Sequence, residues 1–82
     1  MLTSAHLRAA RALLRWEQQT LASKANVSVE TIKRLEKMEG QLDATRVATV
    51  NALKAALEAA GVQFIPENGG GPGVRLKRVS LG

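Results

Sequence analysis

The stretch from Gln18 to Lys37, QQTLASKANVSVETIKRLEK, predicts two short helices joined by a tight turn. Its apolar residues recur at the spacing that two crossing helices need for their buried faces, at Leu21, Ala22, Ala25, Val27, Ile32 and Leu35. Asn26 stands at the turn, and asparagine tolerates the left-handed backbone conformation better than most residues that carry a side chain. Ser28 can cap the second helix, because its hydroxyl oxygen can accept from a first-turn N–H group. We therefore expect residues 28–37 to form a helix that lies at the surface.

Helical signals also stand on both sides of this stretch. Thr3 or Ser4 can cap a first helix whose apolar stripe is Leu7, Ala10, Leu13 and Leu14. After a loop at residues 38–42, Asp43 can cap a fourth helix whose apolar stripe is Val47, Val50, Leu53, Leu57 and Ala60. Gly61 ends that helix, since glycine readily adopts the left-handed conformation beyond a helix C-terminus. Residues 1–61 are thus predicted to form one mainly α-helical domain.

The residues after Gly61 change from a helical to an alternating pattern. Val62 and Phe64 alternate with Gln63, and Val74 and Leu76 alternate with basic residues beyond the turn-rich loop 66–73. This pattern predicts a C-terminal β-hairpin over residues 62–79, which must pack on the helices or add its edge to a second copy, because an isolated hairpin is marginal in water. A dimerisation element and a frayed glycine-rich tail are the alternatives for this segment. Residues 80–82 are expected to be disordered.

Composition limits the kinds of protein that this chain can be. Its 82 residues are 45% hydrophobic, which suits one small domain rather than a deeply enclosed active site. Twelve Lys and Arg against seven Asp and Glu give a net charge of +5, which favours a polyanionic partner such as nucleic acid or serves solubility alone. The chain has no cysteine, no apparent secretion signal and no apolar run of membrane-spanning length. We expect a cytoplasmic protein without membrane contact.

The central motif resembles a known family. Gln18-x-x-Leu21-Ala22, followed by Asn26-Val27-Ser28-x-x-Thr31-Ile32-x-Arg34-Leu35-Glu36, is similar to the helix-turn-helix of the Cro/C1 (XRE-type) transcriptional regulators, and the resemblance covers about residues 7–62. It implies a four- to five-helix lambda-repressor-like DNA-binding domain, to which this chain adds the C-terminal β-hairpin. It also implies a homodimer on a palindromic operator in double-stranded DNA. An ion pair between Arg11 and Glu36 is implied as well, which makes Arg11 structural. Asn26 departs from the family, which usually has a glycine at that turn, and the glycine that usually follows the recognition helix is displaced to Gly40.

Candidate DNA contacts follow from this placement. Base reading is expected from the outward side chains near the start of the recognition helix, Ser28, Val29, Glu30, Lys33 and Arg34. Phosphate contacts are expected from Gln18, Lys24, Lys37 and Arg46. Two alternatives stay open: Glu30 also suits the dipole of the helix N-terminus, and Lys33 and Arg34 can neutralise phosphates without reading bases. Arg75, Lys77 and Arg78 form a second basic group, either a solvated strand edge or a further DNA contact.

Other functions have weaker signals. The run Gly69-Gly70-Gly71-Pro72-Gly73 lacks the Lys-Ser/Thr ending and the following helix of a phosphate-binding loop. His6 is the only histidine, and the chain has no cysteine that could join it as a metal ligand or nucleophile. We therefore expect no metal site, no cofactor and no catalytic triad. The main prediction is a sequence-specific transcriptional regulator, most simply a repressor, and not an enzyme. The alternative is an antitoxin or adaptor that holds a protein partner through its hairpin and binds DNA secondarily.

Overall fold

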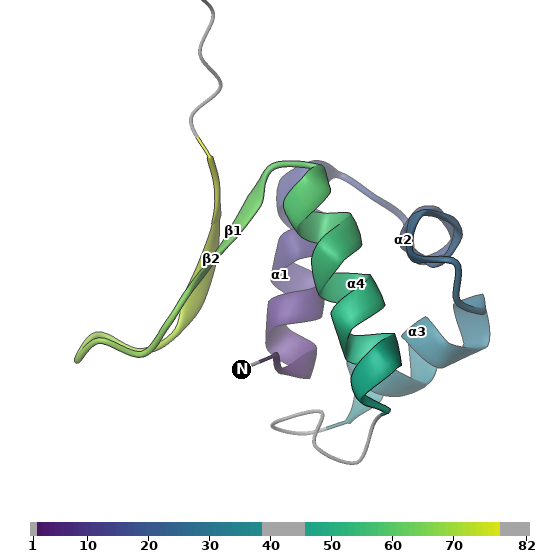
Figure 1. The fold of residues 1–82 in the computed structure, drawn as a ribbon, viewed down its shortest axis with the longest axis horizontal. Coiled ribbons are helices and arrows are strands. Elements are labelled where there is room, and N and C mark those ends of the chain that lie inside the picture. The colour runs from purple at the N-terminus through teal and green to yellow at the C-terminus, as the bar shows by residue number, and fades with distance from the viewer. Residues whose placement is uncertain (1, 39–45, 78–82) are drawn as a thin grey trace, which may run out of the picture.

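The computed structural model describes residues 2–38 and 46–77, which form helices packed beside a small antiparallel sheet (Figure 1). The elements are, in chain order, α1 (Ser4–Leu14), α2 (Gln18–Ala25), α3 (Val29–Lys37), α4 (Val47–Ala59), β1 (Val62–Ile65) and β2 (Gly73–Leu76). The fold is therefore mainly α-helical with a two-stranded hairpin, as the sequence predicts. Within these ranges, no helix combines the length and the apolar character that crossing a membrane requires.

The first helix is closed at both ends by local hydrogen bonds. The Thr3 hydroxyl accepts from the His6 backbone N–H, while the Thr3 N–H donates to His6 Nδ1, so the two residues form a reciprocal capping box. At the other end Arg15 adopts the left-handed conformation, with φ 57°. The backbone N–H groups of Arg15 and Trp16 then donate to carbonyls of the last turn of α1. The helix thus ends without a glycine.

The turn between α2 and α3 has the predicted conformation. Asn26 has φ 57° and ψ 44°, and its N–H group donates to the Ser23 carbonyl, while the Val27 N–H donates to the Ala22 carbonyl. These bonds satisfy the carbonyls at the end of α2. Ser28 caps α3, since its Oγ accepts from the Thr31 N–H at 3.2 Å. The predictions for Asn26 and Ser28 are both confirmed.

One hydrophobic core joins all the helices and the first strand. Its fully buried members are Leu7, Ala10, Leu21, Ile32, Leu35, Leu53, Leu57 and Val62. The core buries four of the six apolar residues predicted from the central motif almost completely, together with Ala25 at 7% exposure, and Val27 packs against it from the turn. Figure 1 shows α2 nearly end-on, whereas α3 extends within the plane of the picture. The two helices therefore cross steeply. That crossing leaves one long side of α3 outside the core.

Two residues predicted to face inward lie at the surface instead. Val47 is 74% exposed, although it was assigned to the apolar stripe of the fourth helix. At roughly 100° per residue, Val47 points about 100° away from the mean direction of Leu53 and Leu57, which is too far around the helix to reach the core. Leu13 is likewise 39% exposed, and the core takes Leu7 and Ala10 of that stripe. The predicted cap Asp43, residues 39–42 of the predicted loop 38–42 and the tail 80–82 lie outside the described residues.

The hairpin packs on the helices through one face. Val62 pairs with Leu76 and Phe64 with Val74, and because directly opposed residues of an antiparallel pair share a face, these four side chains lie on the same side of the ribbon. Val62 is fully buried, and Phe64 and Val74 pack against the core, whereas Leu76 is 45% exposed. Gly61 enters the hairpin with φ 106°, a conformation that favours glycine. Docking on the helices, one of the two expected arrangements, is therefore present.

The left-handed backbone conformation of Arg15 leads to a stability prediction, with a control variant that should change the free energy of unfolding in the opposite direction. We expect Arg15→Gly to raise the free energy of unfolding by about 0.5–1 kcal/mol, because relief of left-handed strain outweighs the entropy that glycine adds to the unfolded chain. Ala12→Gly, an exposed site inside α1, is expected to lower it by a similar amount. Urea unfolding of the two variants and the parent measures both. Destabilisation by Arg15→Gly would contradict the assigned backbone conformation.

Candidate nucleic-acid interface

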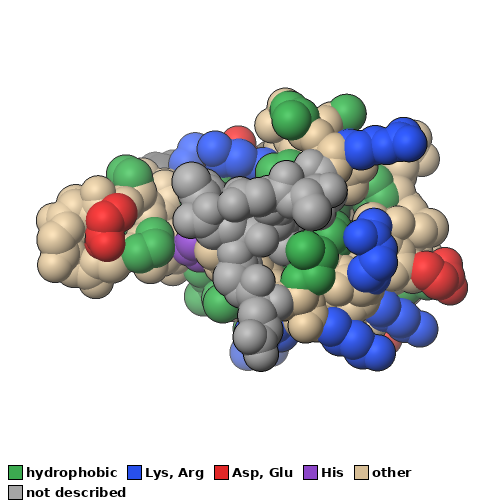
Figure 2. Space-filling model, turned by 90° about the horizontal axis from the view of Figure 1, so that it is seen from below, with side chains coloured by type: hydrophobic (Ala, Val, Ile, Leu, Met, Phe, Trp, Pro, Cys, Tyr) green, Lys and Arg blue, Asp and Glu red, His purple; other side chains and the backbone are tan. Residues whose placement is uncertain are grey.

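The outer side of α3 carries a stripe of charged side chains. Glu30, Lys33, Arg34 and Lys37 are all exposed, and their spacing of i, i+3, i+4 and i+7 places them on one helical face. Ile32 and Leu35 occupy the opposite side and are fully buried. Figure 2 shows several Lys and Arg side chains on the helical part of the molecule, with others nearer the hairpin. We call Lys33, Arg34 and Lys37 the α3 basic stripe.

Two of the predicted base-reading residues are partly used inside the fold. The Ser28 hydroxyl caps α3 and also lies 2.8 Å from the Thr31 hydroxyl. Val29 is half-buried and packs against the core instead of standing free. The helix begins at Val29, directly after its cap Ser28. Apolar Val27, in the turn before it, is also half-buried and packs on the same core. The structure therefore brings Glu30, Lys33 and Arg34 together at the surface and separates them from Val29.

The predicted phosphate contacts come from different elements. Lys24 at the end of α2, Lys37 at the end of α3 and Arg46 before α4 are all exposed. Gln18 is only half-exposed, and its Nε2 donates to Glu36 Oε1 at 3.0 Å. Its side-chain amide is thus directed to a neighbouring helix, so any part it plays at phosphate is shared with this internal bond. The N-cap of α2, Glu17, makes no side-chain capping bond, which leaves the first-turn amides of α2 without a side-chain partner.

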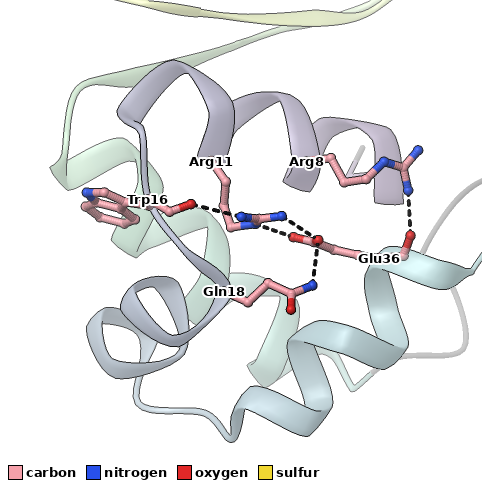
Figure 3. Close-up of polar contacts among 5 residues, drawn as sticks. All are labelled: Arg8, Arg11, Trp16, Gln18 and Glu36. Carbon is pink, nitrogen blue, oxygen red and sulfur yellow. Dashed lines mark hydrogen bonds and ion pairs between the residues drawn. The ribbon is translucent and has the colours of Figure 1, made fainter.

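A buried carboxylate holds α3 against the two preceding helices (Figure 3). Glu36 accepts from Arg11 Nε at 2.6 Å through one oxygen, and from Arg11 Nη2 at 2.8 Å and Gln18 Nε2 through the other. The side chain of Glu36 is 5% exposed and that of Arg11 is 20% exposed. The ion pair implied by the family resemblance is therefore present, in bidentate form. It links the middle of α1, the start of α2 and the end of α3.

Two further contacts of this cluster were not expected from the sequence. Arg11 Nη1 donates to the Trp16 carbonyl at 2.9 Å, which ties the α1–α2 connection to the same guanidinium. Arg8 Nη1 donates to the Glu36 backbone carbonyl near the C-terminus of α3, where a cation also suits the helix dipole (Figure 3). Arg8 lies almost one turn before Arg11, so its spacing alone is compatible with this contact. The partner is a backbone carbonyl, so the pattern of side chains in the sequence does not predict this contact.

The electrostatics of the cluster favour the charged form of Glu36. Burial raises its pKa, but hydrogen bonds from Arg11 and Gln18 and the positive charges of Arg11 and Arg8 outweigh burial, so the pKa falls below its ordinary value. The hydrogen bond to Glu36 in turn raises the pKa of Arg11, against the opposing effect of its own desolvation. Glu36 and Arg11 thus remain an ion pair at neutral pH and act as a structural unit.

The second basic group lies on another part of the molecule. Arg75 and Lys77 are exposed at β2, and Arg75 Nε donates to Gln63 on the neighbouring strand at 2.9 Å. Figure 1 shows the hairpin and α3 on opposite sides of α1. A rigid contact of both groups with one straight DNA segment is therefore not favoured by this arrangement. Arg78 lies outside the described residues, and no cluster of three or more potential metal ligands occurs within 2–38 and 46–77.

The Glu36 cluster predicts a pH-dependent loss of stability. We expect Glu36→Gln to lower the free energy of unfolding by about 2 kcal/mol at pH 7, because the glutamine leaves the Arg11 guanidinium without its counter-charge. Because folding lowers the pKa of Glu36, its contribution is complete above the ordinary value of 4.5 and is lost as the pH falls below it. Urea unfolding at several pH values measures the difference between parent and variant.

The exposed Glu30→Gln on the same helix is the matched control, and we expect it to change stability little at any pH. A parent-to-variant difference for Glu36→Gln that stays constant down to pH 3 would count against the ion pair.

Neither a scan against protein-family models nor a search of curated proteins gives a match for this chain. The candidate interface is thus defined by the exposed stripe on α3, the steep α2–α3 crossing and the ion pair that fixes it.

Proposed function

We propose that this protein is a sequence-specific double-stranded DNA-binding regulator, most simply a repressor, that places α3 in the major groove. The observation that carries the proposal is the α3 basic stripe, fully outside the core on a helix that is held rigidly by the Glu36 cluster. A major groove about 12 Å wide admits one α-helix, and short helices crossing through a three- to four-residue turn leave the second helix free to enter it. The resemblance to Cro/C1 regulators, with their lambda-repressor-like fold, supports the same function.

The α3 basic stripe and the neighbouring Glu30 each have a contact that suits their chemistry. Arg34 can donate two parallel hydrogen bonds to O6 and N7 of a guanine, and Glu30 can accept from the N4 amino group of a cytosine. Lys33 and Lys37 supply positive charge that suits base edges or phosphates. Lys24, Arg46 and the first-turn amides of α2 are candidates for phosphate contacts beside the groove, which add affinity without sequence information. We also propose that the protein acts in the cytoplasm.

The test is selection of bound sequences from random DNA at near-physiological salt, followed by Arg34→Ala. We expect the parent to select a defined site with a log affinity that falls at a slope of about −5 against log salt for about six neutralised phosphates. Arg34→Ala should reduce the preference for that site over random DNA by about ten- to hundredfold, which corresponds to about 1–3 kcal/mol.

Arg75→Ala removes the same charge from the hairpin, and we expect it to leave the preference unchanged. Equal selectivity of the parent and Arg34→Ala, or an equal loss in both variants, would refute the assignment of α3.

We also propose that the protein acts as a homodimer, with the hairpin as the contact. Leu76 supports this assignment, because it is a large apolar side chain left 45% exposed at the end of β2, the second strand of the hairpin. Deleting the whole hairpin is a poor test, since Val62 belongs to the core.

A point substitution on the hairpin is the better test of the dimer. We expect Leu76→Lys to lower the dimer fraction at least several-fold in sedimentation experiments, because two added charges would face each other at the contact. Val47→Lys, at the exposed start of α4, is the matched control and should leave the fraction unchanged. A dimer that survives Leu76→Lys intact would place the contact elsewhere.

A further inference from the structure

A hollow lies between the hairpin and the helices, on the side of the molecule that the proposed DNA contact does not use. It measures about 250 Å³, and its walls are His6 from α1, Lys54 from α4 and Phe64, Ile65, Pro66 and Gly73 from the hairpin. A neighbouring hollow of about 130 Å³ shares Lys54 and Phe64 and extends to Val50. An apolar cavity of about 150 Å³ is known to hold benzene, so the larger hollow has room for one aromatic ring and a small polar group.

The cation beside this hollow, the Lys54 ammonium, makes no ion pair within residues 2–38 and 46–77. The Lys54 ammonium lies 5.8 Å from the centroid of the Phe64 ring, which keeps it at the wall shared by the two hollows. Within the described residues Lys54 has no carboxylate partner, since the ion pair found there joins Arg11 and Glu36. A negatively charged ligand could therefore pair with the Lys54 ammonium without displacing a carboxylate of the described residues.

A second polar group in the wall is buried and incompletely bonded. His6 is only 7% exposed, and its Nδ1 accepts from the Thr3 N–H at 3.1 Å. Burial is the main reason why the pKa of His6 lies below its ordinary value, so the ring is neutral at pH 7 with its hydrogen on Nε2. Nε2 has no hydrogen-bond partner in residues 2–38 and 46–77, although a buried N–H group normally finds one. The ring makes a T-shaped contact with Phe64, with 6.2 Å between the ring centroids.

We propose that this hollow is a binding site for a small aromatic monocarboxylate. The carboxylate would pair with the Lys54 ammonium and accept from His6 Nε2–H, while the ring would lie against Phe64, Ile65 and Pro66. The volume of the hollow lies below the roughly 300 Å³ at which pockets for drug-sized molecules begin, which favours a small ligand. The site is formed by α1, α4 and the hairpin without α3, so it does not depend on the proposed DNA-binding function.

The experiment uses benzoate as the probe and the full chain as the protein. Benzoate is titrated into isotope-labelled protein, and backbone and histidine ring signals are followed by NMR. We expect saturable shifts at His6, Phe64 and Ile65, and at least tenfold weaker binding of benzamide, which has the same shape without the charge. Lys54→Gln should weaken benzoate at least tenfold, whereas Lys24→Gln, an exposed lysine of α2, should leave it unchanged.

Each result decides the proposal. Saturable shifts around Phe64 that depend on Lys54 and on the carboxylate support it. Shifts that spread over all lysines without saturation, equal binding of benzamide, or an equal effect of Lys24→Gln would overturn it. Because Lys54 is exposed and makes no ion pair within the described residues, Lys54→Gln is expected to fold, and its thermal unfolding checks this directly.

Discussion

A carboxylate buried among three helices is the constraint on which the rest of the structure depends. An unpaired charge in that place would cost several kcal/mol, so Glu36 is compatible with the fold only when Arg11 and Gln18 reach it. Apolar packing alone is not directional, whereas a bidentate guanidinium fixes both distance and angle. The pair therefore determines how α3 is oriented on α1 and α2, and with it the direction in which Lys33 and Arg34 point.

Neighbouring residues of α3 lie on different faces of the helix and make different kinds of contact. Ile32 and Leu35 anchor the helix in the core, Glu36 joins it to α1 and α2, and Lys33 and Arg34 are exposed. Arg8 adds a contact at the end of the helix without using any of these side chains, because it bonds a backbone carbonyl. A helix fixed on two sides loses little conformational entropy when it binds a partner, which favours affinity and discrimination.

The hairpin depends on the same core and leaves a different surface. Two strands alone are marginal in water, and here Val62, Phe64 and Val74 gain their stability from α1 and α4. The ribbon meets these helices along one face but leaves hollows around Phe64 and Lys54. The molecule therefore presents α3 on one side of α1 and the hairpin on the other (Figure 1), so the two proposed binding sites share no residues.

Local signals in the sequence determined the helix bounds near Ser28, the left-handed Asn26, the hairpin and the buried positions of the central motif, because capping, turn conformation and periodicity act over a few residues. The pairing of Arg11 with Glu36 came from family resemblance, not from spacing. Only the tertiary structure decided that Leu13 lies outside, that Val29 packs against the core, and that Gln18 and Arg8 bond within the fold. These outcomes depend on contacts between segments distant in sequence, where packing selects among side-chain directions that local patterns leave equivalent.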